Sequence, residues 1–125
     1  MMKAIHYDAE GDILSITFSD ATEQPQKGVE LSDNIVLYYN PDTEKPLQLI
    51  LVSYQAMLQA SQQTPITLDG LAEAPANVQT TVAALLQQTP LTAFFQLVGT
   101  QGKRPLTSRL QEIFTPSMLQ MVTAN

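Results

Sequence analysis

Apolar and polar residues alternate through the first part of the chain, which is the pattern of half-buried β-strands. In the clearest run, Leu14, Ile16 and Phe18 fall on one side of an extended backbone. Strands are predicted at residues 3–7, 13–18, 29–31, 35–39 and 47–52. The segments between them are rich in Asp, Asn, Gly and Pro, which favour turns. No helical pattern intervenes, so an antiparallel β-meander is expected.

From residue 54 onward the apolar residues recur at helical spacing. Val78, Val82, Leu85 and Leu86 share one face of a helix predicted over residues 75–88. Further helices are predicted at residues 54–62, at 91–98 behind Thr89 and Pro90, at 106–114, and after Thr115–Pro116 with Met118, Leu119 and Val122. Thr64–Pro65 and Asp69–Gly70 are predicted to separate the first two of these helices.

These patterns predict a single α+β domain over residues 1–125. Residues 1–54 form the antiparallel β-meander, and residues 55–125 form a helical extension whose helices pack on the sheet. Apolar residues make up 44% of the chain and charged residues 14%, which argues against a disordered protein. A weakly charged surface repels its own copies weakly, so self-association is expected.

Charge and cysteine content limit the classes of partner, site and cellular location that the sequence allows. Residues 1–54 carry the entire net charge of −6, because the acids and bases of residues 55–125 balance. This charge disfavours nucleic acid and anionic membranes as partners. The chain has no cysteine, which excludes disulfides, cysteine-based zinc sites and thiol nucleophiles. It shows neither a secretory signal nor a long apolar run, so a cytoplasmic location is expected.

The N-terminal part resembles a bacterial family known as domain of unknown function 2283. The resemblance rests on His6–Ile16, on Tyr39–Asp42 and on the strand Leu47–Val52, and it covers about residues 2–55. It implies a small β-meander with a helix behind it. It brings no established activity, so it transfers no functional residue to this chain.

The chain departs from that family on one face of the sheet. Gln48 and Ile50 stand where the family tends to carry Gly and Glu, and Tyr38 stands where it tends to carry Asp. The second face of the sheet therefore carries Ile13, Val36, Tyr38, Ile50 and Val52. A sheet that is apolar on both faces must be covered on both. We expect some helices on one face, and either the remaining helices or a second copy of the chain on the other.

The acidic residues of the first turn are a candidate metal site. Asp8, Glu10 and Asp12 resemble the start of a calcium loop, but Ile13 and Ser19 occupy the positions that need glycine and a bidentate acid. A solvated hairpin turn is therefore the preferred interpretation. His6 is the only histidine, and it lacks an orienting partner in any recognisable motif, so a packing or surface role is favoured.

The segment Gly99–Arg104 offers a second candidate. It lacks the residues of a phosphate-binding loop after Lys103, and its Gly-x-x-Gly pattern is that of a loop which clamps nucleotide backbones. An ordinary interhelical loop is preferred, because the chain is acidic. Lys103, Arg104 and Arg109 are candidates for contacting an anion or an acidic partner, with a solvated helix start as the alternative.

No catalytic residue, metal ligand or cofactor is assigned. The preferred hypothesis is a small protein–protein interaction or regulatory module that forms a homodimer, with room for a protein partner that the sequence does not identify. The alternatives are a carboxylate-dependent metal enzyme using Asp8, Glu10 and Asp12, and an RNA-binding module using Gly99–Arg104.

Overall fold

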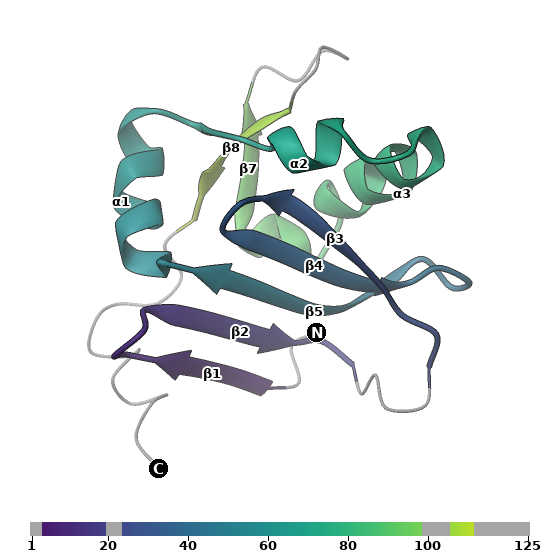
Figure 1. The fold of residues 1–125 in the computed structure, drawn as a ribbon, viewed down its shortest axis with the longest axis horizontal. Coiled ribbons are helices and arrows are strands. Elements are labelled where there is room, and N and C mark those ends of the chain that lie inside the picture. Colours follow the sequence, from purple (N-terminus) through teal and green to yellow (C-terminus); the bar gives the residue numbers. More distant parts are fainter. Residues whose placement is uncertain (1–3, 20–23, 99–105, 112–125) are drawn as a thin grey trace.

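The structure, a computed structural model, describes residues 4–19, 24–98 and 106–111. It confirms the α+β fold, with an antiparallel sheet followed by helices (Figure 1). The strands are β1 Ala4–Asp8, β2 Ile13–Thr17, β3 Lys27–Ser32, β4 Ile35–Asn40, β5 Lys45–Val52, β6 Ile66–Thr67, β7 Phe95–Val98 and β8 Thr107–Leu110. The helices are α1 Tyr54–Gln63, α2 Asp69–Ala72, α3 Ala76–Leu86 and a short 3-10 helix Leu91–Ala93.

The five predicted strands form one antiparallel sheet in the order β1-β2-β5-β4-β3. Strands β3, β4 and β5 follow one another as a meander, and β5 then pairs with β2 of the first hairpin. Strand β5 is thus the central strand. Its alternation is regular, since Leu47, Leu49 and Leu51 are buried whereas Gln48, Ile50 and Val52 are half-buried.

One face of this sheet forms the floor of the core. Tyr7, Leu14, Leu51 and Ile35 lie side by side across four strands, and all four are buried. The next rows add further buried leucines and isoleucines on the same face. This face is the one that the predicted alternation assigned to the core, so that assignment is confirmed.

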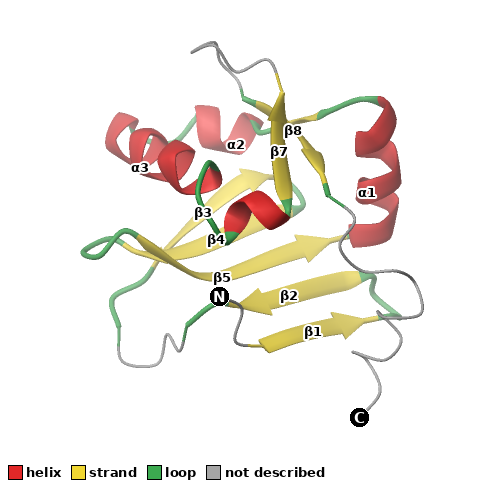
Figure 2. Ribbon diagram, turned by 180° about the vertical axis from the view of Figure 1, so that it is seen from behind, coloured by secondary structure: helices red, strands yellow, loops and turns green. Residues whose placement is uncertain are grey.

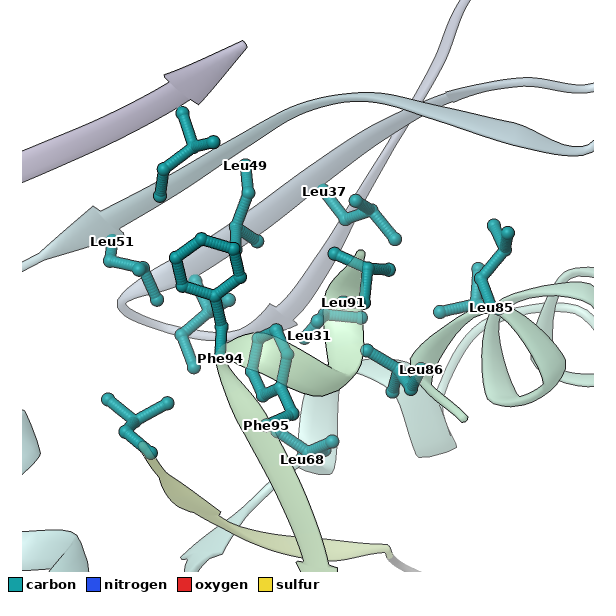
Figure 3. Packing of buried hydrophobic residues seen from close by; sticks show 14 of the residues in the cluster. Leu31, Leu37, Leu49, Leu51, Leu68, Leu85, Leu86, Leu91, Phe94 and Phe95 are labelled. Carbon is teal, nitrogen blue, oxygen red and sulfur yellow. The ribbon is translucent and has the colours of Figure 1, made fainter. Parts of the chain in front are cut away.

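The C-terminal elements supply the other side of the core. Figure 3 shows Leu31, Leu37, Leu49 and Leu51 of the sheet projecting toward side chains of later segments. Those later side chains are Leu68, Leu85, Leu86, Leu91, Phe94 and Phe95, and each is at least 95% buried. The rings of Phe18 and Phe94 meet edge to face with centroids 6.2 Å apart, an arrangement that favours aromatic pairs.

Two of the predicted helices are confirmed, and two are wrong. α1 and α3 lie where the helical spacing placed them. The segment 91–98 instead forms one 3-10 turn followed by β7, and the segment 106–114 forms β8 over its described part. Neither Thr89 nor Pro90 provides a side-chain cap there. The turn predicted at Asp69–Gly70 is the start of the short helix α2.

The two wrong segments pair with each other, which is the physical reason for the error. β7 and β8 run antiparallel, with Phe95 opposite Leu110 and Leu97 opposite Ser108, and β6 adds a third strand. Spacing along one segment cannot reveal a partner strand elsewhere, and tertiary pairing overrides a local helical pattern. The helix predicted after Thr115–Pro116 lies outside the described residues.

Helix α1 connects the two sheets. Its buried Ser61 accepts a hydrogen bond from the Leu110 amide (3.0 Å), and the Gln62 side-chain amide donates to the Leu110 carbonyl (2.8 Å). Both backbone groups of Leu110 at the end of β8 are therefore satisfied by α1. Figure 2 shows α1 beside β8 from the reverse side.

Helix α2 packs against edge strand β3 at a position that requires glycine. A Cβ atom added at Gly70 would lie 2.2 Å from the Glu30 carbonyl oxygen. A carbon atom and an oxygen atom that are not bonded cannot be that close. Any side chain at residue 70 must therefore push α2 away from β3. The helix therefore covers one end of this sheet edge because residue 70 has no side chain.

We predict that Gly70→Ala destabilises the protein by about 1–3 kcal/mol, the range expected for overpacking. The normal gain from replacing glycine with alanine in a helix, about 1 kcal/mol, would be outweighed. Urea unfolding followed by circular dichroism measures the change. Gly11→Ala is the control, because the three atoms nearest to a Cβ there belong to the side chains of Asp8 and Ile13 rather than to backbone. Equal stability of the two variants would contradict the packing of α2 on β3.

Candidate functional site

The second face of the five-stranded sheet lies outside the core. We call it the open face. It consists of Ala4, His6, Asp8, Ile13, Ser15, Thr17, Gly28, Glu30, Val36, Tyr38, Gln48, Ile50 and Val52, which the strand registers place on one side. Every one of them is half-buried or exposed, and none is buried. Within the described residues, the helices pack only on the opposite face.

An apolar stripe crosses the open face obliquely. Ile13 lies opposite Val52, and Ile50 lies opposite Val36. Tyr38 completes the stripe and faces Gly28 of the next strand, where an added Cβ would come within 2.8 Å of the Tyr38 ring. The Tyr38 ring therefore occupies the space that a side chain at residue 28 would need. These are the five residues for which the sequence predicted a second apolar face, and the structure places them on three adjacent strands.

Polar groups surround this stripe. Ser15, Thr17 and Gln48 lie beside it, while His6 and Glu30 stand exposed on the two edge strands. His6 alternates with Ile5 and the buried Tyr7, so its predicted place on the face away from the core is confirmed. An apolar centre within a polar rim is the composition of a protein-binding surface.

The acids of the first turn have an architectural function. Asp8 accepts a bond from the Glu10 amide (3.1 Å), as in an Asx turn. Asp12 instead reaches helix α1. The backbone N–H of Gln55 is shared between the two carboxylate oxygens of Asp12 (3.0 and 3.1 Å), and the backbone N–H of Ala56 donates to one of them (3.5 Å). Asp12 therefore caps a helix that begins over forty residues later, where a negative charge also suits the helix dipole.

Tyr7 joins the same cluster. Its hydroxyl donates to the Asp12 carboxylate at 2.6 Å and accepts from the Gln55 side-chain amide at 3.1 Å. Burial raises the pKa of the Tyr7 phenol above its ordinary value, and the bond to Asp12 raises it further, whereas Gln55 acts in the opposite direction. The phenol therefore stays protonated at neutral pH and serves as a donor to the capping carboxylate.

The predicted hairpin turn is thus confirmed, and the cap was missed. No group of three or more potential metal-binding side chains occurs in the described part of the chain. Asp12 adopts a positive φ of 55° and Ser53, the residue before α1, one of 56°. Both are strained conformations for residues other than glycine. The sequence showed only the turn chemistry of Asp12, because the helix that it caps begins over forty residues later.

We predict that Asp12→Ala costs about 2 kcal/mol, because it removes a helix cap and leaves alanine at a positive φ. Asp12→Asn retains an acceptor oxygen and tolerates that backbone, so it should cost less than half as much. Thermal unfolding and urea unfolding measure the difference. Equal losses in the two variants would mean that the negative charge matters more than the cap geometry.

The predicted basic cluster is only partly placed. Arg109 lies half-buried on β8, opposite Gln96 of β7. Lys103, Arg104 and the whole Gly99–Arg104 segment lie outside the described residues. The prediction of an anion or partner contact by these three basic residues therefore stays a prediction.

Two hollows on the described surface are candidate sites for a small molecule. One of about 400 Å³ lies between the β4–β5 turn, Phe18 and the end of α3. Another of about 310 Å³ lies between β3 and the segment that joins α2 to α3. The charged side chains that line them, Glu44 and Lys45 in the first and Lys27, Glu30 and Glu73 in the second, are all exposed. Neither hollow holds the buried polar groups that fix a small ligand.

Comparison with protein-family models, with curated proteins and with solved structures finds no match to this chain. The resemblance of residues 2–55 to domain of unknown function 2283 therefore stays a prediction. Among the described residues, no helix has the length and apolar character needed to cross a membrane. On the described surface, the open face has the apolar centre and polar rim of a binding surface.

Proposed function

We propose that the chain is a protein–protein interaction module whose contact surface is the open face of the five-stranded sheet, and that it associates with itself. The observation that carries this proposal is the apolar stripe of Ile13, Val36, Tyr38, Ile50 and Val52. These side chains keep part of their surface in contact with solvent. The solvated face of an antiparallel sheet normally carries polar residues instead.

The energetics of this stripe support a binding role. Removing apolar surface from water contributes roughly 25 cal/mol per Å², and β-branched and aromatic side chains on a sheet lose little conformational freedom when they are covered. A sheet with polar residues at these positions would be stable in water without a cover. Covering an apolar second face with another surface lowers the free energy.

The alternative as a carboxylate-dependent metal enzyme has less support. Asp12 is occupied in capping α1 and in accepting the Tyr7 hydroxyl, so its lone pairs already have partners. Binding a metal would require breaking that cap. The RNA-binding alternative depends on Gly99–Arg104, outside the described residues, and the acidic charge of residues 1–54 works against it.

We predict that Ile50→Lys abolishes association through the open face and leaves the monomer folded. Ile50 lies at the middle of the central strand, where a covered ammonium group would be desolvated without a partner. The measurements are sedimentation velocity over a range of concentrations and the set of proteins that co-purify with the tagged chain. Circular dichroism checks the fold.

Ala84→Lys is the matched control. It introduces the same charge at an exposed position of α3, away from the sheet. The proposal expects this variant to associate like the wild-type chain. If Ile50→Lys retained the self-association and every co-purifying protein of the wild-type chain, the open face would not be the contact surface.

A further inference from the structure

We propose that helix α2 covers the edge of the five-stranded sheet, where it blocks outward backbone groups of β3 and so prevents this strand from pairing with a strand of another chain. The edge is separate from the open face, and the proposal does not depend on the proposed function. Three features carry it: the direction of the β3 backbone groups, the position of Gly70, and the contacts that hold α2 in place.

β3 is an edge strand, with β4 on one side and no described strand on the other. The Val52 amide on β5 donates to the Asn34 carbonyl, just before β4 (2.8 Å). Backbone groups along a strand alternate in direction, so those of Val36, two residues later, also point toward β5. Glu30 lies opposite Val36, and the two are therefore not hydrogen-bonded to each other. The N–H and C=O of Glu30 point outward from the sheet, as do those of Gly28 two residues earlier.

Gly70 of α2 lies directly against these outward groups. The Cβ atom that residue 70 lacks would be 2.2 Å from the Glu30 carbonyl oxygen, and the next nearest atoms are the carbonyl carbons of Glu30 and Leu31. α2 therefore contacts the backbone of the edge, and Figure 1 shows it beside the end of β3. An incoming strand would have to lie about 4.8 Å from β3. That space is already filled by α2, so the two cannot occupy this part of the edge together.

The part of the edge that α2 leaves free is short. Gly28 is exposed, and a bulge between Glu30 and Ser32 ends the regular part of β3. Gly28 alone offers one N–H and one C=O to a new strand, whereas Gly28 together with Glu30 offers four groups in register. Uncovered edges are templates for pairing with other chains, and natural sheets often cover them with a helix or loop. Covering Glu30 therefore reduces the available edge to a single residue.

Contacts outside the five-stranded sheet hold both ends of α2. Leu68, the residue before α2, is fully buried, and its amide donates to the Leu106 carbonyl (2.8 Å). At the other end, the Gln79 side-chain amide on α3 donates to the carbonyls of Ala72 (2.9 Å) and Ala74 (2.8 Å). α2 is thus anchored by α3 and by the segment before β8, and it blocks β3 by its position.

Gly70→Ala in the Ile50→Lys background tests the cover. Ile50→Lys is expected to remove association through the open face, so new association reports on the edge. The added methyl group displaces α2, and the association constant should rise about tenfold or more above that of the Ile50→Lys parent, because the edge gains hydrogen-bonding groups. Sedimentation velocity over a range of protein concentrations measures association. Amide hydrogen exchange locates it, since Gly28 and Glu30 should exchange at least about tenfold more slowly in the associated form.

Two further variants separate edge pairing from a general loss of stability. Glu30→Pro, added to Gly70→Ala, removes the outward N–H of residue 30, which pairing with β4 does not use, and should return association to the level of the parent. Asp12→Ala in the same background is the matched control. It is expected to destabilise the chain to a similar extent through the start of α1, while α2 still covers β3, so it should associate no more than the parent.

Three results would overturn the proposal. In the first, Gly70→Ala associates no more than the parent. In the second, Asp12→Ala associates as strongly as Gly70→Ala, which would show that instability drives association. In the third, Glu30→Pro leaves the association of Gly70→Ala unchanged, which would place the contact away from the edge.

A variant without added atoms extends the test if Gly70→Ala does not fold. Gln79→Ala removes the two hydrogen bonds that hold the end of α2, and the same gain in association and the same reversal by Glu30→Pro are expected of it. Every comparison is made with the Ile50→Lys parent. A parent that still associates like the wild-type chain would count against the proposed function, whereas the change caused by Gly70→Ala or Gln79→Ala would still decide whether α2 covers the edge.

Discussion

The central strand β5 places a constraint on the rest of this molecule, because it is apolar on both of its faces. Leu47, Leu49 and Leu51 form the middle of the core, and Ile50 and Val52 form the middle of the open face. Because β5 is hydrogen-bonded to β2 on one side and to β4 on the other, it cannot rotate to bury both of its apolar faces in one core. The described C-terminal elements cover the first face, and no described element covers the second. The core and the proposed interaction surface are thus two consequences of one strand.

The sheet was predictable because its information is local. Alternation of apolar and polar residues set the faces of β1, β2, β4 and β5, and turn residues set their ends. The same alternation identified the five apolar residues of the open face and the orientation of His6. The strand order was not predictable, because no local signal states that β5 returns to pair with β2.

The second part of the chain was harder, for a different physical reason. Leu91, Phe94, Phe95 and Val98 have helical spacing, yet Phe95–Val98 forms a strand because β8 supplies hydrogen-bonding partners for it. Asp12, in the first part of the chain, is a second example of a residue whose contacts are distant in the sequence. Its residue type predicted a turn correctly, but its bonds to the Gln55 amide depend on a fold that brings residues 43 positions apart together. Pairing and capping over long separations become visible only in three dimensions.

The central claim is that association covers the open face, and Tyr38 reports on it directly. Its ring is half-buried on that face, whereas the neighbouring Tyr39 is 3% exposed and belongs to the core. Hydroxyl-radical labelling of the two tyrosines across a range of protein concentrations would measure the exposure of each. The account predicts that labelling of Tyr38 falls as the dimer forms while that of Tyr39 stays low throughout. Labelling of Tyr38 that does not change between monomer and dimer would contradict it.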